Sequence, residues 1–286
     1  MSRSIPEKTF EHWASMYVAH RFPRGSLWWP PNGEDVAVED LGTVPGKAVL
    51  LELKVPEQQA NGGHIVSINI PQLLRYLGRT VPVYYAFPEP LWSGDLIASG
   101  WLGPERRADL AYRRAKGRWF GEWTKVCSAS RLHHILSPLP GVKTMQLPNP
   151  FPGGYSWTEF WRSYRSCGSR QVPSAFMVPE GSVGEVGLGD RIRREQLRNT
   201  LSGFRESTRG LSGASREQVR DSLRDAPRSI FTPEQPGSDS DVYRKVERSD
   251  INEDLRIAFG RDDPGAQMEG PQDLAICAVP FDDLDV

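Results

Sequence analysis

The clearest pattern along the chain is an apolar run at residues 49–55, Val-Leu-Leu-Glu-Leu-Lys-Val, which no glycine or proline interrupts. Such a run predicts a buried β-strand. Because side chains alternate across a strand, Glu52 and Lys54 should share one face and the apolar residues the other. A carboxylate and an ammonium on an apolar strand cost free energy unless they pair or bind a ligand. This strand is therefore the first indication of a site.

Helical and strand-like patterns surround this run. Apolar side chains recur at helical spacing from Phe10 to Val18, and proline and glycine bound a second, leucine-rich helix. The predicted elements are a helix at 6–22, a strand at 35–39, a turn at 42–47, the strand at 49–55, a short strand at 64–68, a helix at 71–78 and a strand at 81–87. This order predicts an α/β core, in which helices lie on both sides of a mixed sheet.

Three side chains with oxygen atoms are expected to converge in this core. The short connection between strands 35–39 and 49–55 favours an antiparallel hairpin, which would bring Asp35 beside Glu52. In the following helix Gln72 and Tyr76 are four residues apart and should share one face.

These residue types suit a hard divalent cation. Mg²⁺ or Mn²⁺ prefers oxygen ligands, and Asp35, Glu52 and the backbone carbonyl of Leu53 could supply them. Lys54 would lie beside the metal, where it could orient or help to deprotonate a water molecule, or offset charge on a scissile phosphate. Two acids and a lysine at a metal form a consistent set for phosphodiester hydrolysis.

Asp35, followed 17 residues later by Glu52-Leu53-Lys54 in this frame of elements, resembles the PD-(D/E)XK nuclease superfamily. Residues 72–76, Gln-Leu-Leu-Arg-Tyr, also resemble the QxxxY motif of its RecB-type branch. The resemblance covers residues 9–87, about a third of the chain. It implies a restriction-endonuclease-like core.

The resemblance also implies a role for each matching residue. Asp35 and Glu52 would be metal ligands, Lys54 the catalytic lysine, and Gln72 and Tyr76 residues that support the site and its substrate. Two further acids, Glu11 and Asp40, are also candidates. Glu11 matches an acidic residue that some members carry on the first helix. Asp40 is a rival to Asp35, because the residue before Asp35 is Glu34 and the motif has proline there.

Simpler interpretations exist for each of these residues. Glu52 and Lys54 could form an exposed cross-strand ion pair worth under about 1 kcal/mol. Asp35 could be a turn residue, and Gln72 could cap its own helix. The chain could then be a non-catalytic module that binds nucleic acid or a protein on the same fold, or an unrelated structural protein.

Composition divides the chain into several predicted parts. Residues 1–178 are expected to form the nuclease-like domain, with a core at 9–90 and an irregular, helical, basic and aromatic extension at 91–178. A linker at 179–189 and a helix at 190–206 follow. Residues 207–286 are rich in Ser, Asp, Pro and Gly, which predicts a largely disordered acidic tail. The end of this tail, 273–286, could bind a protein partner, add a strand to the sheet, or cover a basic groove.

Charge is distributed unevenly although the net charge is only −1. Residues 233–286 hold 14 acidic and 5 basic side chains, whereas residues 1–232 hold 30 basic and 22 acidic ones. A cationic body favours a nucleic-acid partner, here expected to be DNA. The candidate phosphate contacts are Arg106, Arg107, Arg113, Arg114, Lys116 and Arg118, which alternate with aromatic residues. The same stretch could instead be an amphipathic segment whose aromatic side chains join the core.

The remaining features concern the compartment and the pathway. Three cysteines far apart in the sequence indicate neither a disulfide framework nor a metal site. No apolar run reaches the roughly 18 residues of a membrane span, so a soluble, cytoplasmic protein is expected. The sequence thus predicts a metal-dependent deoxyribonuclease, for example an endonuclease of a defence, restriction or repair system.

Overall fold

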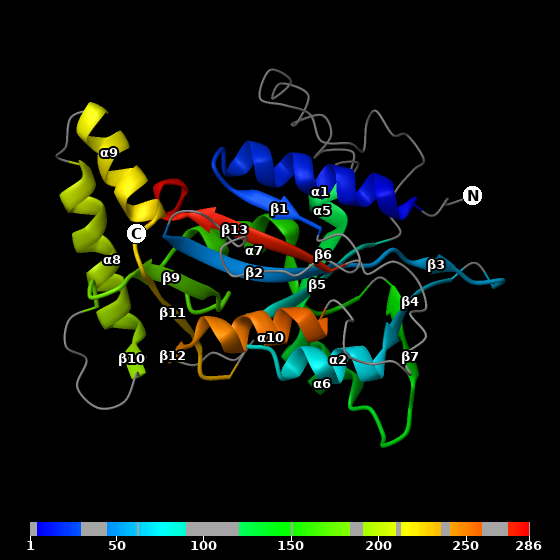
Figure 1. Ribbon diagram of the computed structural model, residues 1–286. Helices are drawn as coiled ribbons and strands as arrows, with labels where there is room; N and C mark the ends of the chain where they lie inside the picture. The colour runs from blue at the N-terminus through cyan, green and yellow to red at the C-terminus, as the bar shows by residue number, and fades with distance from the viewer. Residues whose placement is uncertain are drawn as a thin grey trace.

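The computed structural model describes residues 5–29, 45–61, 63–89, 120–149, 151–183, 191–209, 213–235, 241–258 and 274–285. A large mixed sheet runs through the molecule, and helices cover both of its faces (Figure 1). The helices are α1 (Glu7–Arg21), α2 (Ile70–Leu77), α5 (Phe120–Trp123), α6 (Ala129–Leu136), α7 (Trp157–Arg165), α8 (Arg194–Arg209), α9 (Gly213–Arg224) and α10 (Arg248–Ala258), with a 3₁₀ turn at Phe281–Asp283.

Ten strands form this sheet within the described residues, and three more form a small separate sheet. The strands of the large sheet are β1 (Ser26–Trp28), β2 (Gly46–Leu53), β5 (Val83–Pro88), β6 (Thr124–Ser128), β8 (Tyr155–Ser156), β9 (Ala175–Pro179), β10 (Arg191–Arg193), β11 (Arg228–Pro233), β12 (Val242–Val246) and β13 (Leu274–Pro280). The small sheet contains β3 (Glu57–Gln58), β4 (His64–Asn69) and β7 (Thr144–Asn149).

Strand β2 is the centre of the large sheet, and all of its residues are buried. β13 pairs with it antiparallel from Gly46 to Glu52, which occupies one edge. The opposite edge is divided, because β9 pairs antiparallel with residues 46–48 and β5 pairs parallel with residues 50–53. From there β6 and β8 extend the sheet beyond β5, and β11, β12 and β10 extend it beyond β9. Both edges of β2 are thus filled by strands.

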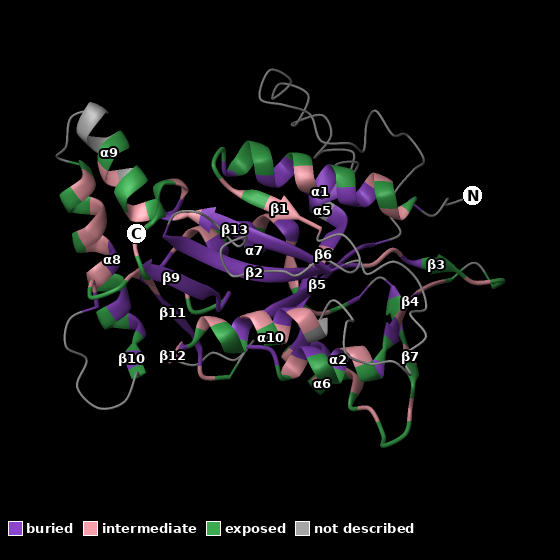
Figure 2. Ribbon diagram, in the orientation of Figure 1, coloured by how far each residue is buried: buried purple, intermediate pink, exposed green. Residues whose placement is uncertain are grey.

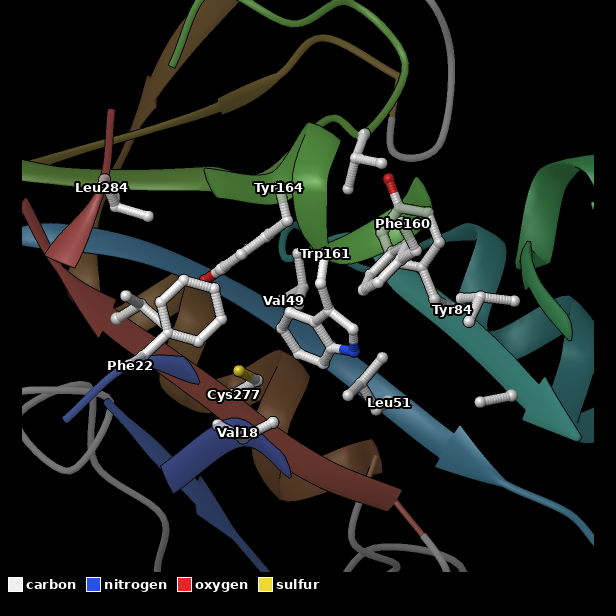
Figure 3. Close-up of a cluster of buried hydrophobic side chains, with 14 of the residues drawn as sticks. Val18, Phe22, Val49, Leu51, Tyr84, Phe160, Trp161, Tyr164, Cys277 and Leu284 are labelled. Atoms are coloured by element: carbon white, nitrogen blue, oxygen red, sulfur yellow. The ribbon is translucent and has the colours of Figure 1, made fainter. Parts of the chain in front are cut away.

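Each face of the sheet carries its own hydrophobic core. Val49, Leu51 and Leu53 of β2 face the core that contains α1, α5, α7 and α8. Figure 3 shows part of this core, with Trp161 and Phe22 packed beside β2. The other face packs against α2, α6 and α10. Figure 2 shows the resulting pattern, in which the central strands are buried and the helices expose their outer sides.

The sequence patterns around β2 are confirmed by this arrangement. α1, β2, α2 and β5 lie where the apolar spacing predicted them, and β2 and β5 are parallel neighbours in a mixed sheet. Helix α7 begins after Ser156, whose side chain and that of Glu159 form a capping box. The chain is therefore an α/β protein with a large mixed sheet flanked by helices.

The extension predicted at 91–178 is wrong as an irregular helical segment over its described residues. It contributes β6, β8 and β9 to the large sheet and α6 and α7 to the two faces. The physical reason is that a short apolar strand buries little surface by itself. These strands become stable only when they pair with β5 and β2, and the local sequence pattern does not show that pairing.

The largely disordered tail predicted from residue 207 is also wrong over residues 213–235, 241–258 and 274–285. These form α9, β11, β12, α10 and β13, and their apolar side chains, among them Ile230, Tyr243, Ile251 and Ile276, are buried. The polar average of the segment conceals these few apolar positions, which are stabilised by packing against distant parts of the chain. Of the three alternatives for its end, an added strand is the one observed, as β13.

The expected hairpin between residues 35–39 and β2 needs a correction as well. Residues 35–39 lie outside the described residues. However, β13 occupies one edge of β2 along residues 46–52, and β9 and β5 occupy the other edge at residues 46–48 and 50–53. The neighbour of Glu52 on the antiparallel side is accordingly Leu274 of β13. None of the helices in the described part of the chain is long and apolar enough to cross a membrane.

Candidate functional site at the end of β2

Glu52 and Lys54 lie at the C-terminal end of β2, on the face that α2 covers. The Glu52 side chain is fully buried, and the Lys54 side chain is 25% exposed. Lys54 Nζ lies 3.0 Å from Glu52 Oε1. The pair is therefore a buried carboxylate in contact with a partly accessible ammonium, and the exposed ion pair considered from the sequence does not describe it.

Helix α2 brings two further polar side chains to this carboxylate. Asn69 caps the helix, since its Oδ1 accepts a hydrogen bond from the backbone N–H of Gln72 at 2.9 Å. The side chain of Gln72 is thereby left for the site, and the alternative that it caps its own helix is wrong. Gln72 Nε2 donates to Glu52 Oε1 at 3.2 Å and to the Tyr76 hydroxyl oxygen at 2.7 Å.

Tyr76 completes the network on the other carboxylate oxygen. Its hydroxyl donates to Glu52 Oε2 at 2.7 Å, and its side chain is almost fully buried. Burial, together with the charge of Glu52, holds the pKa of Tyr76 well above its usual value. The hydroxyl is thus protonated at neutral pH and acts as a donor. Lys54, Gln72 and Tyr76 together direct three donors at one carboxylate.

Leu53 contributes to the site only through its backbone, because its side chain is buried in the core on the opposite face. The backbone N–H groups of Leu50 and Lys54 both donate to the segment that contains β5. Since backbone groups alternate along a strand, the carbonyl of Leu53 is directed to the other edge, one residue beyond the Glu52–Leu274 pair. Any ligand of this carbonyl would lie at that edge.

Glu11 lies apart from this network. It is buried on α1, which packs against the opposite face of the sheet, and Lys8 Nζ contacts its carboxylate at 2.8 Å. Asp35, Asp40 and the six basic candidates from Arg106 to Arg118 lie outside the described residues. Two aromatic residues that follow that basic stretch, Phe120 and Trp123, are fully buried and belong to the core.

The side chains of this network match the expected metal only in part. Glu52 offers the hard carboxylate oxygen that Mg²⁺ and Mn²⁺ prefer. Among the described residues, no group of three or more His, Cys, Asp or Glu side chains could hold a metal ion. The Glu52 carboxylate is thus a suitable ligand for such an ion. A complete metal site would need at least one more acidic side chain from outside the described residues.

The sequence patterns missed Tyr85, which lies in register with Glu52 on the parallel neighbour β5. Its location depends on the pairing of β2 with β5, which the alternation of strand 81–87 alone does not determine.

Searches of protein-family models, curated proteins and solved structures found no match to this chain.

Proposed function

We propose that this protein is a metal-dependent nuclease that hydrolyses phosphodiester bonds in DNA, with Mg²⁺ or Mn²⁺ as its cofactor. One observation supports the proposal most. The Glu52–Lys54 pair and the Gln72–Tyr76 pair, which the sequence suggested as two separate motifs, contact each other through a single buried carboxylate.

Each residue has a role that follows from its contacts. Glu52 would hold the cation, and Gln72 and Tyr76 would fix the orientation of its carboxylate by hydrogen bonds. Lys54, whose side chain is 25% exposed, would reach the attacking water or the phosphate. A bound Mg²⁺ would supply an activated water molecule and charge stabilisation of the phosphate.

The identity of the second acid is a separate question. Asp35 is the candidate from motif spacing, and Asp40 is its rival. The pairing of β13 with β2 adds Asp273, because this residue directly precedes Leu274 in the sequence and Leu274 pairs with Glu52. All three lie outside the described residues, so substitution of each by Asn, followed by Mn²⁺ titration, would distinguish them.

The test is cleavage of supercoiled plasmid, linear duplex, single-stranded DNA and RNA in Mg²⁺, in Mn²⁺ and in EDTA. Glu52→Gln and Lys54→Met should each lower metal-dependent cleavage by at least about 100-fold. Glu57→Gln and Lys143→Met are matched controls, because both residues are exposed, and they should cleave like the wild type.

Two results would contradict the proposal. Cleavage by Glu52→Gln at the wild-type rate would remove the carboxylate from the mechanism. Salt-dependent binding of nucleic acid by the wild type, without cleavage in either metal, would instead favour the non-catalytic binding module. Circular dichroism of each variant would show that its fold is retained.

A further inference from the structure

Tyr85 is the neighbour of Glu52 on the adjacent strand of the large sheet. The two residues are in register on the parallel strands β5 and β2, and both face the core that α2 covers. The ring of Tyr85 lies 5.9 Å from the ring of Tyr76, centre to centre, with the planes inclined by 52°. Tyr76 and Tyr85 therefore pack together at Glu52, although only Tyr76 belongs to the recognised motif.

The hydroxyl of Tyr85 differs from those of its neighbours. Tyr76 donates to Glu52, and Tyr84, the preceding residue, donates to the carbonyl of Pro173 at 2.8 Å on the opposite face of the sheet. The Tyr85 hydroxyl is buried, yet no atom of the described residues forms a hydrogen bond with it. Buried hydroxyl groups nearly always have a partner in the protein or in ordered water.

The Tyr85 hydroxyl can donate a hydrogen bond, as a tyrosine hydroxyl ordinarily does at neutral pH. The residue is only 1% exposed, so a nucleic-acid backbone cannot reach its hydroxyl, and buried polar groups without a protein partner commonly bind buried water.

We infer that Tyr85 is a further positioning residue of the Glu52 site, and that its hydroxyl donates a hydrogen bond to a water molecule held beside the carboxylate. The inference rests on the proposed function for its effect on catalysis, but the water molecule itself can be observed independently. When a group that orients a metal ligand through hydrogen bonds is removed, metal affinity or activity commonly falls by 10- to 100-fold.

The first test is a crystal structure of the wild-type protein that resolves ordered water. A water molecule within hydrogen-bond distance of Tyr85 Oη supports the inference, and a dry hydroxyl overturns it. This test applies even if the wild type cleaves no nucleic acid, so a failure of the proposed function remains distinguishable from a failure of the inference.

The second test compares Tyr85→Phe with Tyr84→Phe, which removes the neighbouring hydroxyl on the opposite face. Tyr85→Phe should lower kcat and the affinity for Mn²⁺ about 10-fold and leave KM for DNA unchanged. Tyr84→Phe should lose thermal stability and keep the wild-type kcat. If wild-type protein cleaves and Tyr85→Phe cleaves equally fast, Tyr85 does not position the site.

Discussion

Lys47 allows a quantitative prediction about how stability depends on pH. It lies on β2 with only 2% exposure, on the face opposite Glu52. Its Nζ donates to the carbonyl of Tyr164 at the end of α7 and lies 4.8 Å from the centre of the Tyr164 ring. Burial lowers the pKa of Lys47 to about 8, although Cys167 opposes this effect.

The free energy of unfolding should depend on pH because Lys47 binds its proton more weakly in the folded state than in the unfolded state. Above pH 8 the folded lysine loses its proton while the unfolded lysine, with a pKa of 10.5, retains it. The unfolded state then binds more protons, so the free energy of unfolding rises with pH. At about 1.4 kcal/mol per pH unit, Lys47 should add about 3 kcal/mol between pH 8 and pH 10.5.

The assay must separate Lys47 from other buried groups. Burial raises the pKa of Cys127 to about 12 and also raises that of Tyr164, so both groups lower stability as the pH rises. Urea unfolding of the wild type and of Lys47→Met, under reducing conditions from pH 7.5 to 10.5, removes these contributions by difference. The wild type should gain about 3 kcal/mol relative to the variant across this range.

An exposed lysine provides the control. Lys143→Met should follow the wild-type curve at every pH, because this side chain is exposed. Parallel curves for the wild type and Lys47→Met would refute the reasoning, since they would show that the buried ammonium keeps its ordinary pKa.

Three further predictions test the fold and the site. Gly46→Ala would place a Cβ 2.3 Å from the carbonyl oxygen of Val279, so it should cost about 1–3 kcal/mol in urea unfolding, and an unchanged midpoint would contradict the pairing of β13 with β2. Tyr76→Phe removes a donor from Glu52 and should lower metal-dependent cleavage at least about 10-fold, whereas cleavage at the wild-type rate would exclude Tyr76 from the site. Ser156→Ala removes the capping box of α7 and should lower the free energy of unfolding by about 1 kcal/mol, and full stability in denaturant would show that the cap contributes nothing.

The part of the structure that the sequence predicted is the part encoded by local patterns. Alternation along the strand placed Glu52 and Lys54 on one face of the sheet, and helical spacing placed Gln72 and Tyr76 on one face of the following helix. These four residues lie within 25 positions of each other, so one strand and one helix suffice to bring them together. The buried network is a consequence of two short periodicities.

The part that could not be predicted depends on distant contacts. Leu274 pairs with Glu52 across more than 200 residues of chain, and no local pattern specifies such a partner. The sequence pattern assigned Lys47 to the turn at residues 42–47. In the structure, β2 begins at Gly46, and Lys47 is accepted there because the end of α7 offers carbonyl groups to its ammonium.

The place of β13 has a consequence for synthesis in the cell. Because a ribosome releases residues in order, β2 emerges long before the strand that fills its antiparallel edge. Until residue 280 has left the exit tunnel, the central strand of the nascent sheet presents a row of unpaired, apolar-flanked backbone groups. The native topology of the large sheet can therefore form only after residues 274–280 have been made.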